Sequence, residues 1–197
     1  MVTFSVPVDD NKVKGFFEFK VEPHAVMFAG SRYLEVEDRT CSGLVKAFGE
    51  LGFSFMTGCA NGVDSCFRRA LIGSEFKDKS IAACAFKDRA DRLKGILPLY
   101  VVPDGLPPRV ALARRTLWMT SRCSLLVLFP SEPFGKGSAL AFKSCIYNSK
   151  PVFVVSKTKP DMSKLYTVLL SSLFGVVNGF WVVPPVYQAT GLCYEAV

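Results

Sequence analysis

Histidine is almost absent from this sequence, because His24 is the only one among its 197 residues. Imidazole is the commonest metal ligand and a frequent general base. A single copy excludes catalytic arrangements that need two imidazoles, and it excludes most zinc sites. The seven cysteines do not make up for this, because no two of them are spaced as Cys-x-x-Cys. We therefore expect no metal site.

Long apolar segments are lacking as well. The best candidate, residues 165–183, is interrupted by Thr, Ser, Asn and Gly, so we expect no membrane span. The first ten residues have no basic segment followed by an apolar run, which a signal peptide requires. An odd number of cysteines without such a signal favours reduced, buried thiols, and we expect a cytoplasmic protein.

Acidic residues are fewer than basic ones. There are 17 Asp and Glu residues against 24 Lys and Arg residues, which gives a formal charge of +7. This excess favours polyanionic partners such as nucleic acid, nucleotides or an acidic membrane surface, although ordinary solubility charge explains it equally well. The basic residues come in pairs or threes, which argues against a basic tail.

Short apolar runs alternate with stretches of helical period through most of the chain. This alternation is typical of a Rossmann-like α/β fold, a parallel sheet with helices on both faces. The right-handed crossover rule then brings the carboxyl ends of the strands to one edge of the sheet. The expected strands are 25–29, 53–56, 80–86, 125–129 and 151–155, with 97–102 as a short strand or a connector. The expected helices are 37–51, 63–72, 107–121 and the stretch from Ser138 to about Asn148.

Both ends of the chain add further elements. Alternating stretches at 3–8 and 13–21 predict an N-terminal β-hairpin. Beyond the core, the pattern predicts a helix over 163–174 and a strand over 180–183. We therefore divide the chain into a hairpin (1–22), a Rossmann-like domain (23–156) and a C-terminal helix and strand extension (157–197) packed on the same domain.

Three glycine-containing loops each follow an expected strand and precede an expected helix. Glycine lets the backbone approach a ligand, and the following helix presents free N–H groups and the positive end of its dipole. With hydroxyl groups and cations in two of the loops, the three together form a candidate phosphate cradle, although each glycine alone could simply make a turn. The loop residues are Gly30, Ser31 and Arg32; Gly58, Cys59, Ala60, Asn61 and Gly62; and Gly135, Lys136, Gly137 and Ser138.

Three further residues belong to the predicted ligand site. Arg114 and Arg115 lie in the helix before the 125–129 strand, from which guanidinium groups could reach a phosphate in the cleft. The alternative for both is a solvated helix face. Asp64, in the first turn after the second loop, either caps its helix or contacts a ribose or base.

Groups for catalysis are scarce. Gly-x-x-x-x-Gly-Lys-Ser/Thr and Gly-x-Gly-x-x-Gly are both absent, so neither a P-loop nor a dinucleotide redox enzyme is indicated. Cys59 is the best-placed thiol, because the following helix start would lower its pKa, but it has no companion base. We expect no catalytic residue and no cofactor.

Several segments, taken in order, resemble one known group of proteins. They are 28–32, 55–64, 113–116, 125–128, 137–138 and 150–154. They resemble the SLOG superfamily of Rossmann-like proteins, and within it the DNA processing protein A (DprA) family. The most specific segment is Thr57-Gly-Cys-Ala-Asn-Gly-Val-Asp64, which is similar to that family's Ser-Gly-x-Ala-x-Gly-Ile-Asp loop. The family's Arg-Asn-Arg is replaced here by Arg114-Arg115-Thr116.

The resemblance implies a Rossmann-like fold that binds a nucleotide or single-stranded nucleic acid at the carboxyl edge. LOG enzymes of the same superfamily release a base from a nucleoside monophosphate, using a Pro-Gly-Gly-x-Gly-Thr-x-x-Glu loop. Residues 130–139 replace that loop here without its catalytic Glu, and Glu132 is the acid that could substitute. Three hypotheses follow: a binding module, which we favour; a sensor or sequestering protein for a nucleotide-derived signal; and a LOG-like N-glycosidase. The hydrophobic C-terminal segment could form an oligomer interface, and we expect a homo-oligomer, although packing on the core explains the segment equally well.

Overall fold

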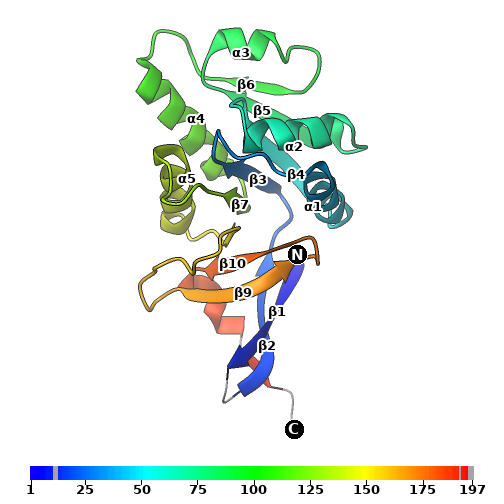
Figure 1. The fold of residues 1–197 in the computed structure, drawn as a ribbon, viewed down its shortest axis with the longest axis vertical. Coiled ribbons are helices and arrows are strands. Elements are labelled where there is room, and N and C mark those ends of the chain that lie inside the picture. The colour runs from blue at the N-terminus through cyan, green and yellow to red at the C-terminus, as the bar shows by residue number, and fades with distance from the viewer. Residues whose placement is uncertain (11–12, 191, 195–197) are drawn as a thin grey trace.

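The computed structural model describes residues 1–10, 13–190 and 192–194. Its centre is an eight-stranded sheet, seen in Figure 1, in which the first six strands are parallel and the last two are antiparallel. In sheet order the strands are β6 (Leu99–Val101), β5 (Ser80–Cys84), β4 (Ser54–Gly58), β3 (Ala25–Gly30), β7 (Leu125–Phe129), β8 (Val152–Val154), β10 (Val177–Val183) and β9 (Thr167–Leu173).

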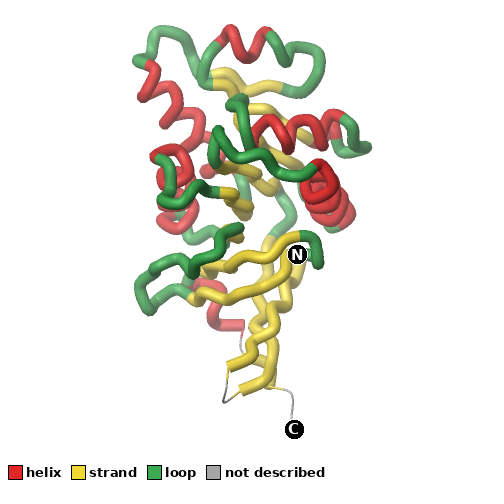
Figure 2. Tube along the Cα trace, in the orientation of Figure 1, coloured by secondary structure: helices red, strands yellow, loops and turns green. Residues whose placement is uncertain are grey.

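Helices cover both faces of this sheet (Figures 1 and 2). Helices α1 and α2 pack on one face, and α4 and α5 pack on the other. Because both faces are covered, the central strands are apolar at successive positions, and all five residues of β7 are buried. The helices are α1 (Asp38–Glu50), α2 (Val63–Ile72), α3 (Lys87–Asp91), α4 (Pro108–Arg122) and α5 (Lys136–Tyr147), with 3-10 turns at Lys77–Lys79 and Pro185–Thr190.

The predicted Rossmann-like sheet with helices on both faces is confirmed. Proline at the first turn of α4 starts that helix where the sequence predicted it, since proline has no N–H group to leave unpaired there. The uncertain 97–102 segment contains the short edge strand β6.

The N-terminal hairpin is also confirmed, and it belongs to a second, smaller sheet. Strands β1 (Val2–Asp10) and β2 (Val13–Val21) pair antiparallel, and β11 (Leu192–Tyr194) joins β2. An aromatic cluster joins this sheet to the large one. The Trp181 ring of β10 lies 5.1 Å from Phe4, 5.0 Å from Phe19 and 5.1 Å from Phe153, measured between ring centroids. The hairpin is therefore anchored on the face that α1 and α2 also cover.

The prediction of a helix over 163–174 is wrong. Residues 167–173 form strand β9, which pairs with β10 in an antiparallel hairpin. The connection turns at Phe174 and Gly175, which both have positive φ angles (56° and 70°), and Val176 N–H bonds to Leu173 O at 3.0 Å. The apolar residues at 168, 169, 170 and 173 fit both the helical period of about 3.6 residues and the strand period of about 2. The segment forms a strand because its partner β10 pairs with the open edge of β8.

No helix within the described ranges combines the length and the apolar character needed to cross a bilayer. The longest of them, α4, has 15 residues.

Candidate phosphate-binding edge

The three glycine loops follow strands that are direct neighbours in the sheet, in the order β4, β3, β7. Because these strands are parallel, the loops leave the sheet side by side at its carboxyl edge. The backbone of Ser31 connects them: its N–H donates to Phe129 O at 2.9 Å, and its carbonyl accepts from Val63 N–H at 3.1 Å. The end of β7, the loop after β3 and the start of α2 are thereby held together.

Two glycines permit this close approach. A Cβ on Gly30 would collide with the carbonyl oxygen of Phe129 and lie 2.7 Å from a Val63 methyl group. Gly62 has a φ of +65°, and a Cβ there would collide with Ser31 O. Both positions therefore require glycine for the packing of one loop on the next.

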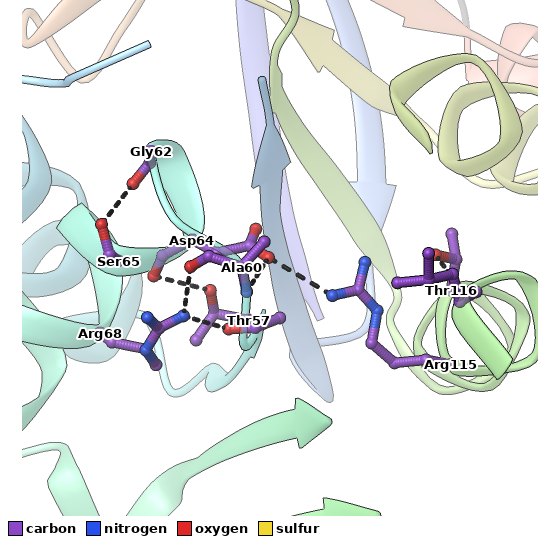
Figure 3. Close-up of polar contacts among 10 residues, drawn as sticks. Thr57, Ala60, Gly62, Asp64, Ser65, Arg68, Arg115 and Thr116 are labelled. Carbon is purple, nitrogen blue, oxygen red and sulfur yellow. Dashed lines mark hydrogen bonds and ion pairs between the residues drawn. The ribbon is translucent and has the colours of Figure 1, made fainter. Parts of the chain in front are cut away.

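Asp64 and Arg115 form a buried ion pair over the end of β4. Asp64 comes from the first turn of α2 and Arg115 from the middle of α4, and Arg115 Nη1 lies 3.5 Å from Asp64 Oδ2 (Figure 3). Their side chains are 14% (Arg115) and 8% (Asp64) exposed. The same Asp64 oxygen accepts a hydrogen bond from Ala60 N–H at 3.2 Å. Asp64 therefore does not cap α2 but fixes the shape of the loop after β4.

Arg115 lacks most of the hydrogen bonds that a buried guanidinium group normally makes. Its Nε and Nη1 atoms are buried and have no hydrogen-bond partner among the described residues, so the ion pair with Asp64 is its main compensation. A buried charged donor without acceptors is costly. An anion arriving at this edge would stabilise the guanidinium.

Arg68, which was not expected from the sequence, supports the same loop from the opposite side. Its Nη1 donates to Gly58 O at 2.6 Å and to Ala60 O at 3.0 Å. Figure 3 shows Arg68 and Arg115 reaching toward the loop from different helices. The available signal was spacing, because Arg68 follows Asp64 by four residues and so shares its helix face.

The residues of the third loop, 135–138, lie at the start of α5. Gly135 is the N-cap of α5, and no described side chain caps that helix end. Ser138 is buried, whereas Lys136 and Gly137 are exposed. Helix α5 packs against β3, β7 and α4. Its start therefore lies at the carboxyl edge of β7, on the face of the sheet that α4 also covers.

The remaining predicted residues divide between the surface and the interior. Arg32 and Asn61 are exposed at the edge, and Cys59 is buried at the end of β4. Arg114 is also exposed and makes none of the contacts of Arg115. Adjacent helical residues lie about 100° apart around the axis, so one member of the pair points to the edge and the other to solvent.

Cys59 is an unusually acidic thiol. A hydrogen bond from Cys84 lowers the pKa of Cys59 to about 5, against the opposing effect of burial. A backbone hydrogen bond from Ala85 and the charges of Arg115 and Arg89 act in the same direction as the Cys84 bond. A lowered pKa was expected from the helix start that follows Cys59, but the largest cause is the second cysteine, Cys84.

Glu132, the acid of the N-glycosidase hypothesis, lies outside these contacts. Its Oε1 accepts a hydrogen bond from Thr158 Oγ1 at 3.2 Å. It lines a separate cleft of about 720 Å³ between the ends of β7 and β8 and the β9–β10 hairpin, together with Lys157 and Phe180.

Comparison with known proteins gives structural matches only. No family model matches the sequence, and no curated protein matches it. Among solved structures, DNA processing protein A from Helicobacter pylori, described for its single-stranded DNA binding mode, matches with a TM-score of 0.55 and 16% sequence identity. That match covers 69% of this chain and 66% of the H. pylori chain.

A second match has the same name. DNA processing protein A from Streptococcus pneumoniae matches with a TM-score of 0.52 and 18% identity, covering 68% of this chain and 50% of the other. This chain therefore spans less than two thirds of either relative. At these identities the likeness concerns architecture: the chain has a Rossmann-like α/β fold similar to that of the DNA processing protein A structures.

Proposed function

We propose that this chain binds the phosphates of single-stranded DNA, or of a nucleotide, at the carboxyl edge of β4, β3 and β7. The observation that carries the proposal is Arg115, a buried cation with unpaired nitrogen atoms, which lies over the end of β4 where the loops after β3 and β4 meet the end of β7. The similarity in fold to H. pylori DNA processing protein A, a protein that binds single-stranded DNA, supports the DNA form of the proposal.

Each part of the edge has a distinct role in this proposal. Arg115 supplies a fixed positive charge that Asp64 holds in place. The uncapped start of α5 supplies backbone N–H donors and the positive end of a helix dipole. Arg32 and Lys136 are exposed and can each neutralise a phosphate of a longer strand.

Base stacking requires an aromatic ring with a free face, and Tyr33 meets this requirement. It is 88% exposed and directly follows Arg32. Trp118 does not meet it, because Tyr100 stacks on its ring at 3.8 Å and the Arg122 guanidinium lies 4.6 Å from the ring centre. Phe134 packs edge-on against Phe142. We therefore assign the stacking role to Tyr33.

The test is the salt dependence of oligonucleotide binding. The affinity for a fluorescent oligothymidylate of about 16 nucleotides would be measured by anisotropy between about 50 and 200 mM NaCl. For single strands, log K falls against log[salt] with a slope of about −0.7 for each phosphate contacted. A salt-independent affinity, or no binding at low salt, would overturn the proposal.

Matched variants locate the contacts. Lys136→Gln should make the slope shallower by about 0.7, because one phosphate contact is lost. Lys143→Gln is the control, because Lys143 is an exposed lysine farther along the same helix. Equal effects of the two variants would mean that only net charge matters. Thymidine monophosphate in the same assay separates the two ligands: competition at similar concentrations favours a nucleotide site, and weak competition favours a strand.

A further inference from the structure

Cys59 and Cys84 lie beside each other on β4 and β5. The register of these parallel strands ends with Gly58 opposite Ala83, and the two cysteines are the next residues after this pair. Neighbouring strands lie about 4.8 Å apart, which is within the range of about 4.4–6.8 Å for the Cα atoms of a disulfide. The backbone therefore permits a bond between the two sulfurs without a new arrangement of the sheet.

The two cysteines belong to one small buried cluster that also contains Ala90. Hydrogen bonding by the Cys84 thiol is the main cause that lowers the pKa of Cys59, and the Ala85 backbone acts in the same direction. The same contact, together with burial, raises the pKa of Cys84. The two pKa shifts have opposite directions, so Cys59 ionises more readily than Cys84. A nucleophile next to a resolving thiol is the arrangement found in redox-sensitive cysteine pairs.

Cys59 is also the more accessible member of the pair. Its exposed fraction is 6%, against 0% for Cys84. Arg115 and Arg89 act on Cys59 electrostatically, so its thiolate lies in a positive environment at the end of a strand. Cys41 differs in both respects, since it is fully buried and burial raises its pKa to about 12.

We propose that Cys59 and Cys84 form a peroxide-sensitive dithiol at the base of the loop that Asp64 and Arg68 hold. The Cys59 thiolate attacks a hydroperoxide oxygen, the O–O bond breaks, and the alcohol or water leaves with a proton taken from solvent. Cys84 then attacks the sulfenic sulfur, the S–O bond breaks, and the departing hydroxide takes the Cys84 proton to form water. The thiols lose two electrons to the peroxide, and a disulfide connects β4 with β5.

This modification is independent of the proposed function. It concerns the chemistry of two sulfurs and is read out on the protein alone, whereas DNA binding is read out by anisotropy on the reduced protein. Failure of one experiment therefore leaves the other unaffected.

The test maps thiols after exposure to hydrogen peroxide. The reduced chain is treated with peroxide, the remaining thiols are alkylated, and the digested protein is analysed by mass spectrometry. Trypsin leaves Cys59 and Cys66 on one peptide, so a second cleavage before Asp64 is needed to separate them. We expect a Cys59–Cys84 crosslink to form about tenfold faster than Cys41 is lost.

Variants assign the roles of the two sulfurs. Cys84→Ala should leave Cys59 as a sulfenic acid that dimedone traps, and Cys59→Ser should leave Cys84 reduced. Cys41→Ala is the control and should retain the crosslink. If a variant does not fold, the time course of the unaltered chain still decides. Loss of all buried thiols at one rate, or Cys59 and Cys84 still reduced after oxidation of free N-acetylcysteine, would overturn the proposal.

Discussion

Replacing Gly58 with alanine would place a methyl group inside the buried ion pair. The new Cβ would collide with Asp64 Oδ2, and it would lie 2.5 Å from Arg115 Nη1 and 3.0 Å from Asp64 Cγ. Arg115 is long and can swing away, but Asp64 is short and its oxygen also holds Ala60 N–H. The methyl group therefore separates the two charges. Gly58 lacks a positive φ angle, so the backbone itself accepts alanine.

The magnitude follows from the burial of the pair. Removing one partner from a buried pair destabilises proteins by about 3–5 kcal/mol. The lower half of that range applies to this pair, because the Arg115 side chain keeps 14% exposure and can reach water. Replacing glycine with alanine also stabilises the folded state by about 0.4–1 kcal/mol, because alanine reduces the conformational entropy of the unfolded chain. The net loss for Gly58→Ala is about 2–3.6 kcal/mol, and the melting temperature falls by roughly 4–14 °C at about 2–4 °C per kcal/mol.

Thermal unfolding followed by circular dichroism measures this difference. The matched control is Gly137→Ala, because no atom lies within 4 Å of a Cβ at Gly137. Gly137 is helical, so alanine there should leave stability unchanged or raise it by up to about 1 kcal/mol. Gly58→Ala should also weaken oligonucleotide binding, since Arg115 loses its fixed position. A Gly58→Ala melting temperature equal to that of the unaltered chain would refute this account of the site.

Three further predictions test other parts of the structure. Gly62→Ala should lower stability by about 1–3 kcal/mol in thermal melts, because alanine would have a φ of +65° and would collide with Ser31 O. Trp181→Ala should cost about 3–5 kcal/mol in urea unfolding, because this ring joins the N-terminal hairpin to the large sheet. Alkylation of Cys59 by iodoacetamide should have a nearly constant rate between about pH 6 and pH 8, because both values lie above its pKa of about 5. A tenfold rise per pH unit, as for an ordinary thiol of pKa about 8.5, would contradict the last of these.

The core of the fold was predictable because the apolar strands, the glycine loops and the helical periods follow one another consistently along the sequence. The β7 run Leu125–Phe129 is apolar at every position, as a strand covered on both faces must be, and a glycine loop and a helical period follow it. The C-terminal hairpin was not predictable in this way. Residues 167–173 satisfy a helical and a strand pattern equally, and the β8 edge that selects the strand is distant in sequence.

The candidate site was predictable in its loops but not in its side chains. Glycines after strands indicate where the backbone approaches a ligand, and the structure does bring these three loops to neighbouring strand ends. Which arginine enters the edge depends on the rotation of α4 about its axis, and tertiary packing sets that rotation. Arg115 and Arg114 therefore looked equivalent, and nothing in the sequence singled out Arg68.

The hydrogen bonds of the edge indicate which loop would hold the phosphate. The loop after β4 resembles the DNA processing protein A sequence most, yet its inward-facing groups are already occupied. Ala60 N–H bonds to Asp64, Val63 N–H bonds to Ser31 O, and Arg68 occupies two carbonyls. Neither α2 nor α5 has a side-chain cap. The start of α5 is different because, among the described residues, its first backbone hydrogen bond is Ala139 N–H to Gly135 O, which leaves the N–H groups of residues 136–138 available. An anion beside Arg115 would therefore take its backbone donors from α5, with the β4 loop acting as the rigid support that positions Arg115. On this argument Lys136 is more important for binding than Asn61, although Asn61 belongs to the more family-like loop.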